Sequence, residues 1–149
     1  MKKSKVLFVC IHNSARSQMA EALLNHVCGE KFEAFSAGLE AGSLNSLAVE
    51  AMRQIGLDIS GNQTKKVWKF PKDGGVYSDV ITVCDEASAK RCPVFPFGVK
   101  RLHWSFADPS AFAGPLEQRL AKTIEVRDQI LAKILDWCAV ACAPEKPSI

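Results

Sequence analysis

A cysteine and an arginine stand six positions apart near the N-terminus, in the stretch VLFVCIHNSARSQMAEALL. Cys10 follows a short run of β-branched and aromatic residues, which predicts a buried strand over residues 5–9. Helical spacing of apolar residues begins near Ser17, so residues 11–16 are the loop between the strand and the helix. Such a loop directs several backbone N–H groups into one concavity, where the helix dipole adds positive potential. This arrangement is an oxyanion cradle.

The side chains of this stretch fit a nucleophile inside an anion site. Arg16 presents a planar fork that matches two oxygens of a tetrahedral anion. The positive field of the loop favours a thiolate at Cys10, which is the nucleophilic form of the side chain, and Ser17 can hydrogen-bond that thiolate. A cysteine that closes a strand is more often an inert core residue than a nucleophile, so the catalytic interpretation depends on the strand before Cys10 and the helix after it. The predicted anion-binding residues are Ile11, His12, Asn13, Ser14, Ala15, Arg16 and Ser17.

Strand and helix signals alternate along the rest of the chain. The pattern predicts strands over residues 5–9, 32–37, 79–83 and 99–104, and helices over residues 17–28, 46–55 and 116–142. Asn45 is the expected cap of the second helix, and Gly29 and Gly56 are the expected stops of the first two. The last helix is amphipathic, with one apolar face of Leu120, Ile124, Leu131, Ile134, Leu135 and Cys138. Alternating strands and helices imply an α/β sandwich with a parallel sheet covered on both faces.

The composition bounds the class of protein. The chain has 149 residues, 48% hydrophobic and 23% charged, which favours one soluble domain over residues 1–149 with a flexible tail at 143–149. A net charge of +3 without long basic runs argues against nucleic-acid binding and suits a small anionic substrate. The apolar run before His12 is too short for a signal peptide or a membrane span, so we expect a cytoplasmic protein. Cysteines in such a protein indicate reactive thiols or metal rather than a disulfide framework.

Several motifs in order resemble one known family. The stretch CIHNSARSQMAEALL is similar to the signature loop of the low-molecular-weight tyrosine phosphatase fold, and in particular of its arsenate reductase branch. The similarity continues through SAGLEA (36–41), TVCDEA (82–87), CPVFP (92–96) and HWSFADP (103–109). It implies a three-layer sandwich with a four-stranded parallel sheet in the order 2-1-3-4. It also implies a nucleophile at Cys10, an anion loop completed by Arg16, and a general acid at Asp108, which precedes Pro109.

The other cysteines decide between a phosphatase and a reductase. A phosphatase needs one thiol because water completes its reaction. Reduction of arsenate needs two electrons, so a second thiol must attack the arsenic adduct of the first, and a disulfide remains in the protein when arsenite departs. Cys84 ends the third predicted strand, which in the implied sheet order lies about 4.8 Å from the first. Cys92 follows in the segment DEASAKRC and is placed to carry the disulfide to the surface. We therefore predict a relay through Cys10, Cys84 and Cys92.

Structural roles are the alternative for the other cysteines and for one histidine. Cys84 is also compatible with core packing, and Cys92 with a passive loop thiol; zinc ligation is disfavoured because the ligand spacing is absent. We interpret Cys28 as structural, Cys138 as a core residue and Cys142 as an exposed bystander. His103 at the end of a strand is expected to be hydrogen-bonded.

The resemblance also raises the question of a bound cation. Some family members use the positions of Asn13, Glu21 and Ser36 with a following acidic residue to bind potassium. Here Lys65 and Lys66 stand where that acid would fall, so an ammonium in place of the cation and a plain solvated surface both remain open.

The function that follows is arsenate reduction. The expected partners are arsenate and a reductant, either thioredoxin or glutaredoxin with glutathione; no metal or other cofactor is expected, and no nucleic acid or membrane. A low-molecular-weight protein tyrosine phosphatase is the alternative, although tyrosines that would flank a phosphotyrosine ring after the Asp-Pro pair are replaced by Ser110, Ala111 and Phe112. A non-catalytic thiol sensor or phosphocysteine carrier is a second alternative.

Overall fold

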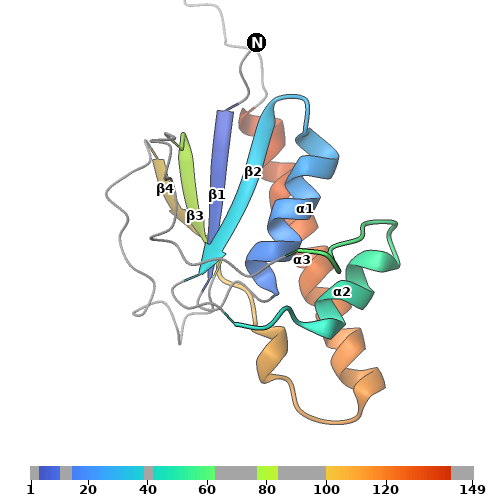
Figure 1. Cartoon of the computed structure of the whole chain (residues 1–149). Helices are drawn as coiled ribbons and strands as arrows, with labels where there is room; N and C mark the ends of the chain where they lie inside the picture. The colour runs from blue at the N-terminus through green and yellow to red at the C-terminus, as the bar shows by residue number, and fades with distance from the viewer. Residues whose placement is uncertain (1–3, 11–14, 39–41, 63–76, 84–99, 142–149) are drawn as a thin grey trace, which may run out of the picture.

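A parallel sheet forms the centre of the molecule. The computed structural model describes residues 4–10, 15–38, 42–62, 77–83 and 100–141. Within them, the four strands β1 (Ser4–Cys10), β2 (Phe32–Gly38), β3 (Asp79–Thr82) and β4 (Lys100–His103) pair in the order β2-β1-β3-β4 (Figure 1). All three pairings are parallel, so the carboxyl ends of the strands meet at one edge. The α/β class and the strand order predicted from the sequence are confirmed.

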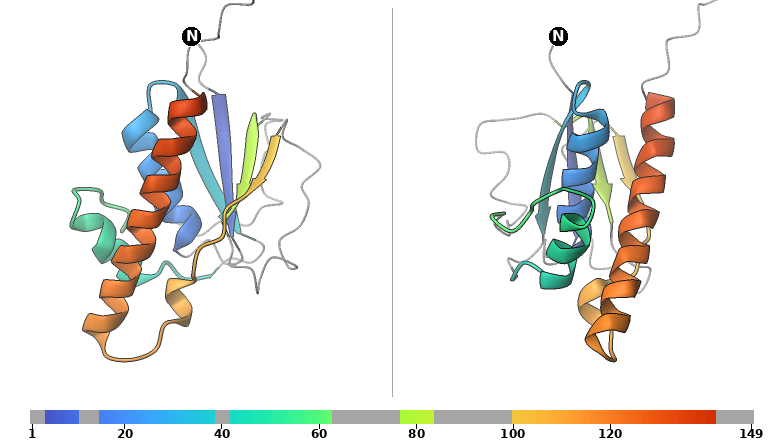
Figure 2. Two further views of the ribbon diagram at one scale, coloured as in Figure 1. Left: turned by 180° about the vertical axis from the view of Figure 1, so that it is seen from behind. Right: turned by 90° about the vertical axis from the view of Figure 1, so that its right-hand side faces the viewer.

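The helices that the structure describes pack on one face of this sheet. They are α1 (Arg16–Cys28), α2 (Ser46–Arg53) and α3 (Leu116–Ala141), with a short 3-10 turn η3 (Pro109–Ala111) before α3. Figure 2 shows α1 and α3 side by side over the strands, with α2 beside the N-terminal half of α3. The expectation that helices also cover the other face concerns residues outside the described part of the chain. None of the described helices is long and apolar enough to cross a membrane.

Alternation along β1 explains how the sheet is buried. Val6, Phe8 and Cys10 point into the core shared with α1 and α3, whereas Leu7 and Val9 belong to a second cluster on the opposite face. All five are at most 2% exposed, as expected for a central strand of a parallel sheet. Burying each large apolar side chain contributes about 1.5–3 kcal/mol, so this strand is a stable support for Cys10 at its end.

The helix ends follow the predicted signals. Asn45 caps α2, because its side-chain oxygen accepts hydrogen bonds from the backbone N–H groups of Leu47 (2.8 Å) and Ala48 (3.0 Å). The chain leaves α2 through Gly56, whose φ of 82° is disfavoured for residues with a side chain. The first helix ends at Cys28, immediately before the predicted stop at Gly29.

The buried face of α3 differs in detail from the predicted one. Leu135 is 49% exposed, although its spacing placed it on the apolar face, and Arg127 is buried instead. The guanidinium of Arg127 donates to the carbonyl oxygen of Ala51 at 2.8 Å and pairs with Asp128. Burial of this cation is tolerated because its N–H groups have partners, which periodicity in apolar residues cannot reveal.

A disulfide joins α1 to α3, two helices that the sequence analysis did not connect. Cys28 at the end of α1 and Cys138 near the end of α3 are bonded, with their Cα atoms 6.8 Å apart. Cys138 is a core residue, as predicted, and Cys28 packs against the same core, but the bond between them was not predicted. The two positions are 110 residues apart, and only the packing of α1 against α3 brings them together.

Candidate active site

Cys10 lies at the carboxyl edge of the sheet, the edge where ligands of parallel α/β sheets bind. It is the last residue of β1, pairs with Gly38 of β2, and is only 2% exposed. The preceding residue Val9 pairs with Thr82 of β3, so the ends of β1 and β3 are adjacent. Cys10 therefore ends a strand that has a parallel neighbour on each side.

The N-terminus of α1 opens directly beside Cys10. The backbone N–H of Met19 donates to the carbonyl of Ala15 at 2.8 Å, and Ala15 provides no side-chain cap for the helix. The first turn of a helix carries N–H groups without intrahelical partners, together with the positive end of the helix dipole. This turn is therefore suited to an anion. Ile11, His12, Asn13 and Ser14, the other predicted loop residues, lie outside the described residues.

Ser17 contacts the candidate nucleophile. Its Oγ lies 2.9 Å from Sγ of Cys10, and the Ser17 side chain is completely buried. A thiolate can only accept a hydrogen bond, so in that state the hydroxyl donates to the sulfur. Water cannot replace the hydroxyl easily at a buried position. The Ser17 hydroxyl is therefore placed to hydrogen-bond the sulfur of Cys10.

Arg16 connects the helix start to the loop after β4. Its Nη1 donates to the carbonyl oxygen of Phe106 at 3.2 Å, and its Nη2 lies 3.5 Å from Oδ2 of Asp108. The Arg16 side chain is 4% exposed, against 25% for Asp108. Each of these nitrogens carries a second N–H, so the guanidinium keeps donors for an oxyanion while these contacts hold its plane. The arginine is positioned before any ligand arrives.

Asp108 is fixed from the other side by a short chain of hydrogen bonds. One carboxylate oxygen accepts from the backbone N–H of Ser110 at 2.9 Å, which caps η3, and Pro109 follows in the first position of that turn. The hydroxyl of Ser110 accepts in turn from Nδ2 of Asn45, at 2.9 Å. Asp108 thus faces Arg16 yet keeps contact with solvent.

Other expected contacts surround the site. Ser36 donates its hydroxyl hydrogen to Oε1 of Glu21 at 3.2 Å, so two of the positions that some family members use to bind potassium are in contact here. His103 Nδ1 lies 2.6 Å from Oγ1 of Thr82, which confirms the prediction of a hydrogen-bonded histidine. In the part of the chain that the structure describes, no group of three or more His, Cys, Asp or Glu residues lies close enough to hold a metal ion. Lys65 and Lys66 fall outside that part.

The structure therefore brings Cys10, Arg16 and Ser17, which share one N-terminal stretch, together with Asp108 from the segment after β4. Cys84, Cys92 and Cys142 lie outside the described residues, so the relay remains a prediction. Two contributors were missed by sequence reasoning. The carbonyl of Phe106 is a backbone group and leaves no signal in residue types. Asn45 was identified only as a helix cap, and its bond to Ser110 depends on tertiary structure.

The sequence of the chain is similar to those of known proteins along most of its length. The profile of the family described as low molecular weight phosphotyrosine protein phosphatase matches residues 5–135. A protein named arsenate reductase from Bacillus licheniformis is 43% identical over 135 residues, which cover 90% of this chain and 94% of that protein.

Solved structures agree in fold along most of the chain. A structure described as an arsenate reductase in the phosphate binding state superposes with a TM-score of 0.74 at 30% identity, covering 92% of this chain and 98% of that one. A thioredoxin-dependent arsenate reductase from Corynebacterium glutamicum gives a TM-score of 0.67 at 26% identity, covering 97% of this chain and 64% of that one. The family match over residues 5–135 includes Cys10, Arg16 and Asp108.

Proposed function

The chain belongs to the low molecular weight phosphotyrosine protein phosphatase family, and from this premise we propose that the protein is an arsenate reductase with Cys10 as its nucleophile. The observation that carries the proposal is the contact of Cys10 with Ser17 beside the pair of Arg16 and Asp108. Attack on a tetrahedral oxyanion requires a thiolate, a cation and a carboxylic acid. Cys10, Arg16 and Asp108 would supply these groups. The names of the relatives favour arsenate over a phosphate ester.

Substrate binding follows from the electrostatics of the helix start. Arsenate is a tetrahedral anion, and the loop of residues 11–16 with the N-terminus of α1 offers backbone N–H groups and positive potential. Arg16 adds charge-assisted hydrogen bonds to the arsenate oxygens. Its existing bond to the carbonyl of Phe106 limits the rotamer entropy lost on binding.

The first chemical step joins sulfur to arsenic. The Cys10 thiolate attacks arsenic, an As–O bond breaks, and the departing oxygen takes a proton from Asp108 and leaves as water. Hydroxide or oxide leaves poorly without protonation, so the acid accelerates this step. Before the step, the contact between Arg16 and Asp108 links the anion site to the acid, and protonation of Asp108 releases that ion pair.

The second step moves two electrons to arsenic. In our proposal the Cys84 thiolate attacks Sγ of Cys10, and the electron pair of the As–S bond passes to arsenic, which leaves as arsenite. Cys92 then attacks Cys84, restoring the Cys10 thiol and leaving a Cys84–Cys92 disulfide. The pairing of Val9 with Thr82 supports the proximity, since Cys84 follows Thr82 by two positions.

An external thiol must return the enzyme to its reduced state. We propose a thioredoxin or a glutaredoxin with glutathione as donor, acting in the cytoplasm, and one structural neighbour is named as thioredoxin-dependent. The reaction balances without a metal or another cofactor, because each arsenate takes two electrons from one pair of thiols and the donor replaces them.

Single-turnover kinetics test the proposal. Reduced protein should release one arsenite per Cys10 and end with no accessible thiol at Cys84 or Cys92. The Cys10→Ser variant should release none, and Cys84→Ser should stop at the arsenic adduct. The Asp108→Asn variant should slow release by about 100- to 10,000-fold, the usual contribution of general acid catalysis.

The same variants separate the alternatives. A phosphatase would be supported by two results together. Cys84→Ser would hydrolyse a phosphate ester as fast as the parent, and the parent would release no arsenite. A thiol sensor or phosphocysteine carrier would keep a reactive Cys10, show no turnover, and be indifferent to Asp108→Asn.

A further inference from the structure

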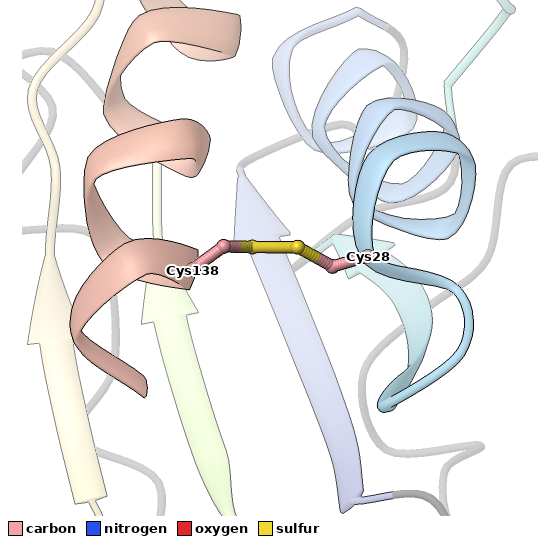
Figure 3. The surroundings of a disulfide bond; sticks show 2 residues. All are labelled: Cys28 and Cys138. Carbon is pink, nitrogen blue, oxygen red and sulfur yellow. A yellow bond between two sulfur atoms is a disulfide. The ribbon is translucent and has the colours of Figure 1, made fainter. Parts of the chain in front are cut away.

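The bond between Cys28 and Cys138 stands apart from the proposed catalytic thiols. Figure 3 shows the two side chains meeting in the space between the end of α1 and the last turns of α3. Arg16 and Cys28 are the first and last residues of α1, so about 18 Å of helix separates the disulfide from the anion site. At that separation its sulfurs cannot exchange directly with Cys10.

The two sulfurs differ in their access to solvent. Cys138 is 5% exposed and belongs to the core cluster, whereas Cys28 is only partly buried. A surface pocket of about 450 Å³ lies against Cys28; its lining consists of Asn25, His26, Val27, Cys28, Gly29, Glu30 and Lys31. Cys28 is therefore a lining residue of this pocket, whereas Cys138 is not among its lining residues and is buried in the core.

The backbone around Cys28 is held in place by specific contacts. Asn25 exchanges two hydrogen bonds with the backbone of Ala34, at 3.2 and 2.9 Å, and so ties the end of α1 to β2. Gly29 allows the chain to turn, because a Cβ there would stand 2.2 Å from the carbonyl oxygen of Asn25. The N–H of Lys31 then donates to the carbonyl of Cys28 at 3.1 Å. The wall of the pocket that contains Cys28 is therefore preorganised.

We propose that Cys28 and Cys138 are a second redox site, a reversible dithiol/disulfide couple that exchanges with thiol reductants through the pocket at Cys28. The reductant thiolate attacks Sγ of Cys28 and forms a mixed disulfide, while Cys138 leaves as thiolate and takes up a proton. A second thiol of the reductant attacks the mixed disulfide and releases Cys28. Two electrons pass from the reductant, which becomes a disulfide, to the protein; the reverse sequence, with a disulfide as oxidant, restores the bond.

The state of this couple controls how firmly α1 is held to α3. The bond is the covalent link between the helix that begins at the anion site and the long C-terminal helix. Trp137, next to Cys138, packs against Phe32 with ring centroids 4.8 Å apart and against Trp104 at 6.5 Å. Opening the bond should therefore change the fluorescence of Trp137, which gives a signal that does not depend on arsenate.

The experiment uses redox buffers of reduced and oxidised glutathione with no arsenate present. A chain in which Cys10, Cys84, Cys92 and Cys142 are all replaced by serine retains only the pair under test. After equilibration, the protein is quenched with acid, alkylated and weighed, and its tryptophan fluorescence is recorded. Peptide mapping of the unmodified full chain in the same buffers repeats the measurement in case the multiple variant does not fold. Because the catalytic thiols are removed, the result is independent of the proposed reductase activity.

The proposal predicts one transition in which both thiols appear together, reversibly, with a matching fluorescence change. The rate of opening should rise in proportion to thiol concentration and be unaffected by low urea. Single-cysteine controls in the same background sharpen the test: the Cys138→Ser variant should form a mixed disulfide at Cys28 at least about 10-fold faster than Cys28→Ser does at Cys138, because Cys138 is buried. Reduction only upon unfolding, two thiols that never bond, or equal reaction of the two single cysteines would overturn it.

Discussion

Removing the hydroxyl of Ser17 should slow the chemistry of Cys10 by a calculable factor. The Oγ of Ser17 lies 2.9 Å from Sγ of Cys10, and neither residue is more than 2% exposed. A hydrogen bond to a charged group is worth about 1.5–3 kcal/mol, and a buried position prevents water from replacing it. Since about 1.4 kcal/mol corresponds to a factor of ten in rate, Ser17→Ala should reduce Cys10 reactivity by about 10- to 150-fold.

The assay is alkylation of Cys10 by iodoacetamide at pH 7, followed by peptide mass spectrometry, with single-turnover arsenite release measured in parallel. Thr123→Ala is the matched control, because Thr123 is also completely buried and its hydroxyl donates to the carbonyl of Arg119 within α3. It removes a buried hydroxyl without touching the site, so it should lower stability but leave Cys10 alkylation unchanged. An unaltered alkylation rate in folded Ser17→Ala would refute the argument that this hydroxyl stabilises the thiolate.

Three further perturbations have defined outcomes. Arg16→Lys should raise the KM for arsenate by about 10- to 100-fold in steady-state assays, since one charged hydrogen bond of the fork is lost; an unchanged KM would place arsenate elsewhere. The hydrogen bond from Arg53 lowers the pKa of Glu50 from 4.5, so Arg53→Ala should return it toward that value in an NMR titration, and no movement would contradict the pairing. Cys138→Ser should lower the free energy of unfolding by about 2–4 kcal/mol in urea titrations of oxidised protein, because the bond to Cys28 closes a loop across 110 residues; equal stability would mean that the bond does not persist in solution.

Local patterns predicted the elements well because burial and capping act over a few residues. The strand that ends at Cys10 and the cap at Asn45 were both identified from their immediate neighbours. The buried Arg127 was not, because its environment depends on which part of α2 faces α3, and neither was the exposure of Leu135. Periodicity depends on hydrophobicity alone. It therefore cannot identify a cation such as Arg127, which is buried together with its hydrogen-bond partners.

In the candidate site, too, the residues within one loop could be predicted from the sequence, whereas the contacts between distant segments could not. Cys10 and Arg16 were identified from a single loop, since a strand end and a helix start fix their separation. Asp108 required the family resemblance, and its contact with Arg16 at 3.5 Å is a tertiary feature. The bond of Cys28 to Cys138 could not be predicted, because six cysteines allow many pairings and no local signal selects among them.

The most direct test of the reductase account is a peptide map made after one equivalent of arsenate is added to fully reduced protein. Free thiols are alkylated after arsenate addition, and arsenite is measured in the same sample. The account predicts equimolar arsenite and a Cys84–Cys92 disulfide, while Cys10 is recovered as an alkylated thiol. A map in which both Cys84 and Cys92 remain alkylated, with no arsenite released, would contradict it.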